Sequence, residues 1–547
     1  MTHPTYPSPV LPDVRAAARR LGRRRFLTVT GAAAVLAFTT HLPSAHASPV
    51  DPRVLADDPF TLGVASGDPR PDSVVLWTRL AVRPYEPDSG LPAAPLPVDW
   101  EIAEDEHFRR VVRRGTAVAH PEFHHAVHLE PDGLAPGRDY WYRFRSGRFV
   151  SPVGHTRTAP APDARPTALR LGLAACQAYH QGYFTAHRHL AEDDLDAVVH
   201  LGDYLYEYAV DAAGGDRRYT DRTLPAHFDR EAVTLADYRM RYALYKTDPD
   251  LAAAHAAHPW IVTWDDHETE NNYAGDVPED NPDNAIPPEE FLLRRAAAYR
   301  AYWENMPLRA PQRPTGADMR LYRRLRYGRL AQLDVLDTRQ YRSDQANGDG
   351  WKRPGPELDD PGRTMLGAAQ ERWLTDGWRT SDTRWQVVAQ QVVLSPRRDR
   401  PGDDYLVSMD AWDGYPAARE RFLAGAEAAG VANLVVLTGD VHVHYGLDIP
   451  RRADRPEAGT AGVEIVTTSI ASGGDGADRP DNYDDLRAAN PHLRFYNGRR
   501  GYVRLTLQAD QLRADYLTLP WVTRPGAPAT VAARLVSAAG DPGLTVA

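Results

Sequence analysis

Four apolar segments in the latter two thirds of the chain end at side chains that commonly bind metal ions. The segments, each with the group that follows it, are 168–175 with Cys176, 196–201 with Asp203, 260–263 with Asp265, Asp266 and His267, and 434–437 with Asp440 and His442. In open α/β sheets, ligands bind just beyond the carboxyl ends of the strands. A single Asp in such a place is usually a turn or cap residue, but four groups in the same place favour one shared metal site.

The donor types in these groups indicate more than one kind of cation. Asp203 and Tyr206 are three residues apart, so both can reach one centre just beyond the strand. A thiolate from Cys176 and a phenolate from Tyr206 favour ferric iron, because zinc sites prefer Cys and His whereas Tyr is a ligand of ferric iron. Carboxylates and the amide of Asn271 or Asn272 suit a hard cation, calcium or magnesium.

A site with two or more cations suits attack on a phosphorus centre. The cations can orient a phosphate, lower the pKa of a bound water and offset charge on the leaving oxygen. Asp203 and Asp440 are candidates to bridge two cations, and His267 is a candidate contact for the leaving group. The sequence therefore predicts a metal-dependent phosphate-ester hydrolase.

Two further catalytic candidates have a structural alternative each. His442 and His444 are two residues apart, so on a strand they would point to the same face. His444 is then either a catalytic contact or a polar residue at the edge of the sheet. Arg339 could clamp a phosphate oxygen with its planar guanidinium or form a structural salt bridge.

The segments that must position these groups alternate with helical stretches. Uninterrupted apolar runs are typical of strands buried on both faces, and helical patterns such as 291–304 and 417–429 lie between them. We therefore expect an α/β layered catalytic domain over residues 165–525. Short alternating strands with turn signals predict a small all-β sandwich over 58–158, and residues 526–547 are expected to form a C-terminal tail.

The first 47 residues have the composition of an export signal. They hold six arginines and one acidic residue, followed by a short, mildly apolar stretch and the triplet Ala45-His46-Ala47. This order describes a signal peptide, and the letters GRRRFL at 22–27 resemble a twin-arginine signal. The alternative is a basic amphipathic helix. We expect export by the twin-arginine machinery and a secreted mature protein. No integral membrane segment is expected in it, because no other segment nears the roughly 18 apolar residues of a membrane span.

Composition disfavours several other classes of function. The chain has 547 residues, of which 42% are hydrophobic and 25% charged, as in ordinary globular proteins. Its net charge is −10, and −15 without the first 47 residues, which disfavours specific nucleic-acid binding. Cys176 is the only cysteine, so no intrachain disulfide can form, and a buried apolar role is the alternative to metal binding.

Seven groups of sequence blocks together resemble the PhoD family of alkaline phosphatases. The blocks are FTLGVASGDP at 60–69, ACQ at 175–177 with QGYF at 181–184, HLGDYLYE at 200–207, WDDHE at 264–268 with NNY at 271–273, DTRQYR at 337–342, DAWDGYP at 410–416 and LTGDVH at 437–442. They occur in the order expected for that family across roughly residues 58–520, and jointly they are specific for it.

The resemblance implies a four-layer α/β/β/α metallophosphoesterase-like core preceded by a small all-β sandwich. It also implies phosphate-ester hydrolysis with Fe3+ and Ca2+. The iron ligands that it implies by position are Cys176, Asp203, Tyr206, Asp440 and His442. The calcium ligands that it implies are Asp203, Asp440 and the amide of Asn271, with Asn272 as its competitor and Asp266 as a further ligand or a support.

Three functions remain open on the sequence. The first is an exported phosphomonoesterase that acts as a monomer on small phosphate esters. The second is a phosphodiesterase, including a phospholipase D-like enzyme on phospholipids, because related chains with this core cleave diesters. These two functions differ in how open the substrate pocket must be. Segments that could cover the pocket as lids are 276–287, 347–361 and the C-terminal tail. The third, an inert cell-surface binding module, is disfavoured by the intact set of candidate ligands.

Overall fold

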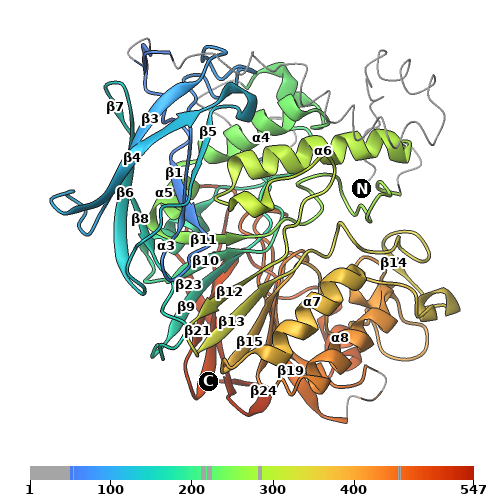
Figure 1. Cartoon of the computed structure of the whole chain (residues 1–547). Helices are drawn as coiled ribbons and strands as arrows, with labels where there is room; N and C mark the ends of the chain where they lie inside the picture. Colours follow the sequence, from blue (N-terminus) through green and yellow to red (C-terminus); the bar gives the residue numbers. More distant parts are fainter. Residues whose placement is uncertain are drawn as a thin grey trace.

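Two large β-sheets form the centre of the molecule (Figure 1). The computed structural model describes residues 50–52, 55–210, 217, 224–280, 286–453, 455 and 458–547. Within these ranges the larger sheet has ten strands in the order β24-β23-β22-β21-β9-β10-β11-β1-β2-β5. Its strands are β1 (Val64–Gly67), β2 (Val75–Arg79), β5 (Ala126–Leu129), β9 (Leu169–Ala174), β10 (Ala197–His200), β11 (Pro259–Val262), β21 (Gly501–Leu507), β22 (Gln511–Thr518), β23 (Thr530–Ala538) and β24 (Asp541–Val546). Strands β9, β10 and β11 at its centre are parallel.

The second sheet has seven strands in the part of the chain that the structure describes, in the order β12-β13-β15-β17-β19-β18-β20. Its strands are β12 (Arg323–Tyr327), β13 (Ala331–Val335), β15 (Trp385–Ala389), β17 (Leu434–Thr438), β18 (His444–Pro450), β19 (Thr460–Val466) and β20 (Leu493–Asn497). Strands β13, β15, β17 and β19 are parallel. A short separate pair, β14 (Trp351–Lys352) with β16 (Val407–Ser408), lies outside both sheets.

The two sheets pack face to face and helices cover their outer faces. Leu173 and Val199 of the larger sheet share one buried cluster with Val387 and Leu437 of the smaller sheet. The helices over the larger sheet are α3 (Thr185–Glu192), α4 (Leu235–Lys246), α5 (Pro249–Ala257) and α6 (Pro288–Asn305), and those over the smaller sheet are α7 (Gly367–Thr380) and α8 (Pro416–Ala428). A further helix, α9 (Tyr483–Ala489), precedes β20. The predicted four-layer α/β/β/α core is therefore confirmed.

The layers explain why the central strands are apolar runs in the sequence. Neighbouring residues of a strand point to opposite faces, and Val198 of β10 packs among the helices whereas Val199 packs between the sheets. Both faces are buried, so neither position can be polar without a partner. Polar side chains such as Asp203 follow these runs at the ends of the strands.

The N-terminal β-sandwich is present, but it shares a sheet with the core. The strands β3 (Leu96–Ala103), β4 (Val111–Ala119), β6 (Asp139–Ser146), β7 (Phe149–Val150) and β8 (Gly154–Arg157) form one layer. This layer packs on β1, β2 and β5 through side chains such as Leu76, Ile102 and Phe144. Because β1, β2 and β5 continue the ten-stranded sheet, the two expected domains form one connected body.

The expected C-terminal tail at 526–547 is corrected by the structure. Residues of this segment form β23 and β24, which extend the larger sheet beside β22. Leu535 and Leu544 are buried in the cluster between the two sheets. The segment 530–538 reads TVAARLVSA, without a strict alternation of apolar and polar residues, so its periodicity did not identify β23. The turn before β24 uses Gly540 at a φ of +91°.

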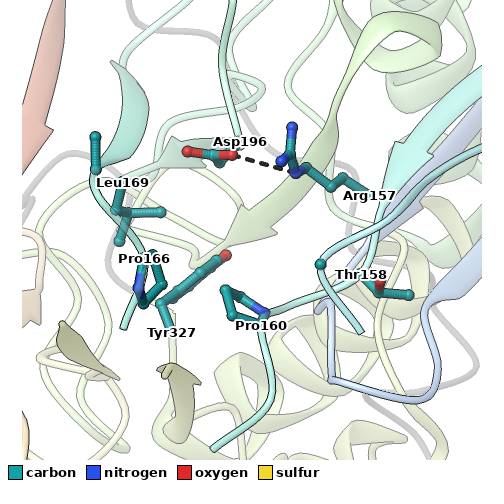
Figure 2. Close-up of a pocket in the computed structure, with 9 residues that line it drawn as sticks. Arg157, Thr158, Pro160, Pro166, Leu169, Asp196 and Tyr327 are labelled. Atoms are coloured by element: carbon teal, nitrogen blue, oxygen red, sulfur yellow. Dashed lines mark ion pairs between the residues drawn. The ribbon is translucent and has the colours of Figure 1, made fainter. Parts of the chain in front are cut away.

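A cavity of about 60 Å³ lies between the end of the N-terminal region and the core (Figure 2). Arg157, at the end of β8, reaches across it to Asp196 at an N–O distance of 3.4 Å. Asp196 precedes β10, whereas the candidate ligand Asp203 follows this strand. The cavity therefore belongs to the opposite end of the sheet from the expected metal site.

The predicted signal segment 1–47 lies outside the described residues, as do residues 281–285 of the first expected lid. No helix among the described residues is both long enough and apolar enough to cross a membrane.

Candidate metal centre

The four predicted groups meet at the carboxyl ends of β9, β10, β11 and β17. The loops after β9 and β10 are joined by backbone hydrogen bonds from Cys176 to Gly202 and from Gln177 to Asp203, both 3.0 Å. Gly202 adopts a φ of +111°, and a Cβ on it would lie 2.4 Å from the Cβ of Asp265. A glycine here lets the loops after β10 and β11 approach closely, so their carboxylates share one space.

Metal-binding atoms gather in three overlapping groups. The groups, whose ligand atoms lie within 4.8 Å of one another, are Cys176 with Asp203 and His442, Asp203 with Asp266 and His267, and Asp265 with Asp266 and Asp440. Asp203 and Asp266 each belong to two groups, so the three form one continuous centre. Residues separated by up to 266 positions in the sequence therefore converge, as the strand-end argument predicts.

Several candidate ligands have an unusual backbone conformation. Cys176, Asp203, Asp440 and His442 all have a φ between 55° and 66°. This left-handed region costs a non-glycine residue roughly 1–2 kcal/mol, and such strain is found mainly at functional sites. The shared conformation turns each side chain away from its strand direction and toward the centre.

Tyr206 completes the group that contains the thiol. Its hydroxyl donates to Asp203 Oδ2 at 3.0 Å and lies 2.9 Å from His442 Nε2. Ser472 Oγ donates to the same hydroxyl at 2.9 Å and accepts from the Ala178 N–H. Sulfur, phenol, carboxylate and imidazole atoms thus surround one point, and Ser472 is a support that the sequence analysis missed.

The donor set fits bound cations. Asp203 Oδ1 and Asp265 Oδ2 are buried and have no hydrogen-bond partner, which is costly for a carboxylate unless a cation binds it. Burial raises the pKa of Asp203 and of Asp440, and Asp265 and Asp266 add to both shifts. Burial also raises the pKa of Cys176, assisted by Asp203 and Asp440. The raised pKa values favour the protonated forms of these three groups when no cation is bound, so metal binding should release protons and weaken as pH falls.

His444 is not part of the centre, which corrects the prediction that it faces the same side as His442. Strand β18 begins at His444, and His442 lies before it with a φ of +56°. The two-residue spacing therefore gives no common face. His444 is fully buried, with Nε2 3.2 Å from the Leu517 carbonyl and Nδ1 accepting from Thr468 N–H at 3.2 Å.

Arg339 neutralises carboxylates of the centre. It is fully buried, bonds Asp265 and Asp410, and lies 3.5 Å from both Asp266 and Asp440. Of its two possible roles, the geometry supports the structural salt bridge rather than the phosphate clamp.

The two asparagines also have different surroundings. Asn271 donates its side-chain amide to Glu279 at 2.6 Å and its backbone N–H to Glu207 at 2.9 Å. Asn272 donates its backbone N–H to Asp266 Oδ2 at 2.7 Å. Of the two, Asn272 is the one hydrogen-bonded to a carboxylate of the centre.

Two buried glutamates, absent from the predicted set, organise the centre. Glu207 Oε2 lies 2.8 Å from His267 Nδ1, so the other ring nitrogen faces Asp203 and Asp266. Glu268 accepts the N–H groups of Asp203, Tyr204 and Asp265 at 3.1, 2.6 and 2.8 Å. Both glutamates are the last residues of quoted sequence blocks, HLGDYLYE at 200–207 and WDDHE at 264–268, and their place in these blocks was the signal for them.

Glu268→Ala should destabilise the protein. The change leaves three buried N–H groups without an acceptor, and we expect the free energy of unfolding to fall by about 3 kcal/mol or more. Thermal and urea unfolding of the metal-free chain measure this loss. Glu268→Gln keeps one carbonyl acceptor and serves as the matched variant, with a smaller loss. Equal stability of Glu268→Ala and the unchanged chain would contradict the conclusion that Glu268 holds the loops after β10 and β11 together.

The fold and the donor set define a metallophosphoesterase-type protein. Comparison with known families agrees: the model described as "PhoD-like phosphatase" matches residues 171–516, and "PhoD-like phosphatase, N-terminal domain" matches 45–160. Alkaline phosphatase D of Bacillus subtilis (strain 168) is 49% identical over 488 residues, which cover 89% of this chain and 82% of that protein. A solved structure titled "Structure of PhoD" has a TM-score of 0.85 and 48% identity, and the match covers 90% of this chain and 92% of that one.

The chain therefore belongs to the PhoD-like phosphatase family, a family of phosphoric ester hydrolases. The predicted resemblance is confirmed.

Proposed function

We propose that this chain is an exported hydrolase of small phosphate monoesters that uses ferric iron and calcium. The observation that carries the choice of metals is that two of the three donor groups are unlike, the thiol-containing group and the group of Asp265, Asp266 and Asp440, and that the third group joins them through Asp203 and Asp266. One group offers a thiol, a phenol and an imidazole, and the other offers carboxylates alone. Unlike donor groups favour unlike cations.

The iron would be held by Cys176, Tyr206, Asp203 and His442. Tyrosine is a ligand of ferric iron, and the soft thiolate favours a transition metal over calcium. The calcium would be held by carboxylate oxygens of Asp265, Asp266 and Asp440, because calcium takes oxygen ligands. When bound, the two cations supply positive charge at the phosphoryl group and lower the pKa of a water.

His267 is placed to give a proton to the leaving oxygen. Burial lowers the pKa of His267, but Glu207, Asp266 and Asp203 outweigh burial and raise it well above its usual range. A protonated imidazole can serve as a general acid, and Glu207 fixes the ring so that Nε2 faces the centre. This chain thus supplies an oriented proton donor beside the carboxylates, and Arg339 balances part of their charge.

Export is supported by the arginine-rich segment 1–47 and its A-x-A end. It also fits the lone cysteine, because a thiol that binds metal within a folded chain is protected from oxidation. The twin-arginine route is proposed on the GRRRFL letters alone.

One set of measurements tests these proposals together. The full chain is expressed in bacteria, cell fractions are assayed, and the purified protein is analysed for metals and for hydrolysis of p-nitrophenyl phosphate, bis-p-nitrophenyl phosphate and phosphatidylcholine. We expect secreted protein with iron and calcium, preference for the monoester, and loss of activity with EGTA that calcium restores. Preference for either diester would establish the phosphodiesterase instead, and indifference to EGTA would exclude calcium.

A further inference from the structure

Tyr208 is an exposed aromatic side chain at the candidate centre. It is 39% exposed, and its ring meets the His267 ring edge-on with 5.3 Å between centroids and 68° between planes. Among the described residues, the large apolar side chains that are exposed include two aromatic ones, Tyr208 and Trp351. Trp351 packs against Arg397, outside the centre, so Tyr208 is the one that touches a candidate site residue.

The segment that carries Tyr208 is held firmly. Arg241, which is buried, donates from one guanidinium nitrogen to the carbonyls of Tyr206 and Tyr208 and from another to the carbonyl of Arg230. Tyr206, Glu207 and Tyr208 are consecutive in the sequence, and each makes a different contact at the centre. Tyr206 reaches the thiol group, Glu207 holds His267 Nδ1, and Tyr208 borders the His267 ring. The position of the Tyr208 ring is therefore set by the same anchored backbone that positions the proton donor.

The rings of Tyr206 and Tyr208 both contact the His267 ring. The Tyr206 ring lies 4.1 Å from the His267 ring, centroid to centroid, and Tyr206 is buried whereas Tyr208 is exposed. Side chains on the Tyr206 side of the centre are buried, so atoms of a bound substrate that extend beyond its phosphoryl group lie along the exposed side, where Tyr208 lies.

We propose that Tyr208 determines specificity on the leaving-group side and favours leaving groups that carry an aromatic ring, such as a nucleoside. The inference rests on the proposed phosphatase function. An exposed tyrosine offers a flat face for stacking, and stacking on a base is tolerant of its identity.

Two esters that differ only in the aromatic ring provide the test. Adenosine 5′-monophosphate and ribose 5-phosphate both leave through a primary alcohol, so His267 acts on the same type of oxygen in each. For the unchanged protein we expect a higher kcat/KM for adenosine 5′-monophosphate. Tyr208→Ala should lower that value about tenfold, the order for loss of one base stack, and change the value for ribose 5-phosphate less than twofold.

Three comparisons make the result decisive. Tyr208→Phe should keep the preference, because the ring is retained, and Trp351→Ala should keep it as the matched exposed aromatic outside the centre. Metal content is measured for every variant and should not change. An equal fall for both esters in Tyr208→Ala, or no preference in the unchanged protein, would overturn the specificity role while leaving the phosphatase function intact. An unchanged, metal-loaded protein that hydrolyses neither ester would overturn both.

Discussion

Asp203→Asn should lower kcat about a thousandfold and leave the fold intact. Asp203 belongs to the thiol-containing group and to the group with Asp266 and His267, and Asp266 in turn belongs to the proposed calcium group, so Asp203 joins the two proposed cation sites. Asparagine keeps the volume and can still accept the hydrogen bond from Tyr206. It loses the negative charge and one of the two oxygens, and removing a single electrostatic contact to a transition state typically costs 10²- to 10³-fold.

The control for Asp203→Asn lies at the other end of the same strand. Asp196 precedes β10 as Asp203 follows it, and Asp196 accepts the backbone N–H of Arg170 at 2.8 Å. Asp196→Asn should retain metal content and turnover. Steady-state kinetics, metal analysis and circular dichroism on both variants measure turnover, metal content and folding. A fully active Asp203→Asn protein would contradict a bridging role.

The strand-end argument from the sequence succeeded where the apolar pattern of a segment by itself identifies a central strand of a sheet. An apolar run buried on both faces must be a central strand, and the polar residue directly after it must lie at the edge of the layers. Cys176, Asp203, Asp265, Asp266 and Asp440 all follow this logic, and the three groups of donor atoms confirm their convergence. The four-layer core follows from the same pattern of runs and intervening helices.

The argument failed for contacts that depend on the backbone conformation of a single residue or that join segments far apart in the sequence. The common face expected for His442 and His444 assumed an extended strand, but His442 is left-handed. Whether Asn271 or Asn272 meets the carboxylates depends on a turn in which Asn272 has a φ of +49°. Ser472 contacts Tyr206 across 266 positions, and no local pattern in the sequence identifies such a pair.

Cys176→Ser should abolish iron binding while calcium binding persists. The serine hydroxyl is a hard, neutral donor, and it replaces the soft thiolate that distinguishes this group from the carboxylates. The group formed by Asp265, Asp266 and Asp440 does not include Cys176, so its cation should remain. Loss of iron should also remove the visible charge-transfer absorption of a thiolate or phenolate bound to ferric iron.

The alternative for Cys176 is a buried apolar side chain, since it is 1% exposed and packs in the cluster between the sheets. Cys176→Ala separates the two roles, because alanine suits an apolar site but supplies no donor atom. If Cys176 binds iron, both variants should lose iron and colour and retain calcium by elemental analysis. If either variant retained iron, colour and turnover, Cys176 would be excluded from the centre. Because burial and the carboxylates of Asp203 and Asp440 raise the thiol pKa, iron uptake by the unchanged apoprotein should release a proton from Cys176 and weaken as pH falls.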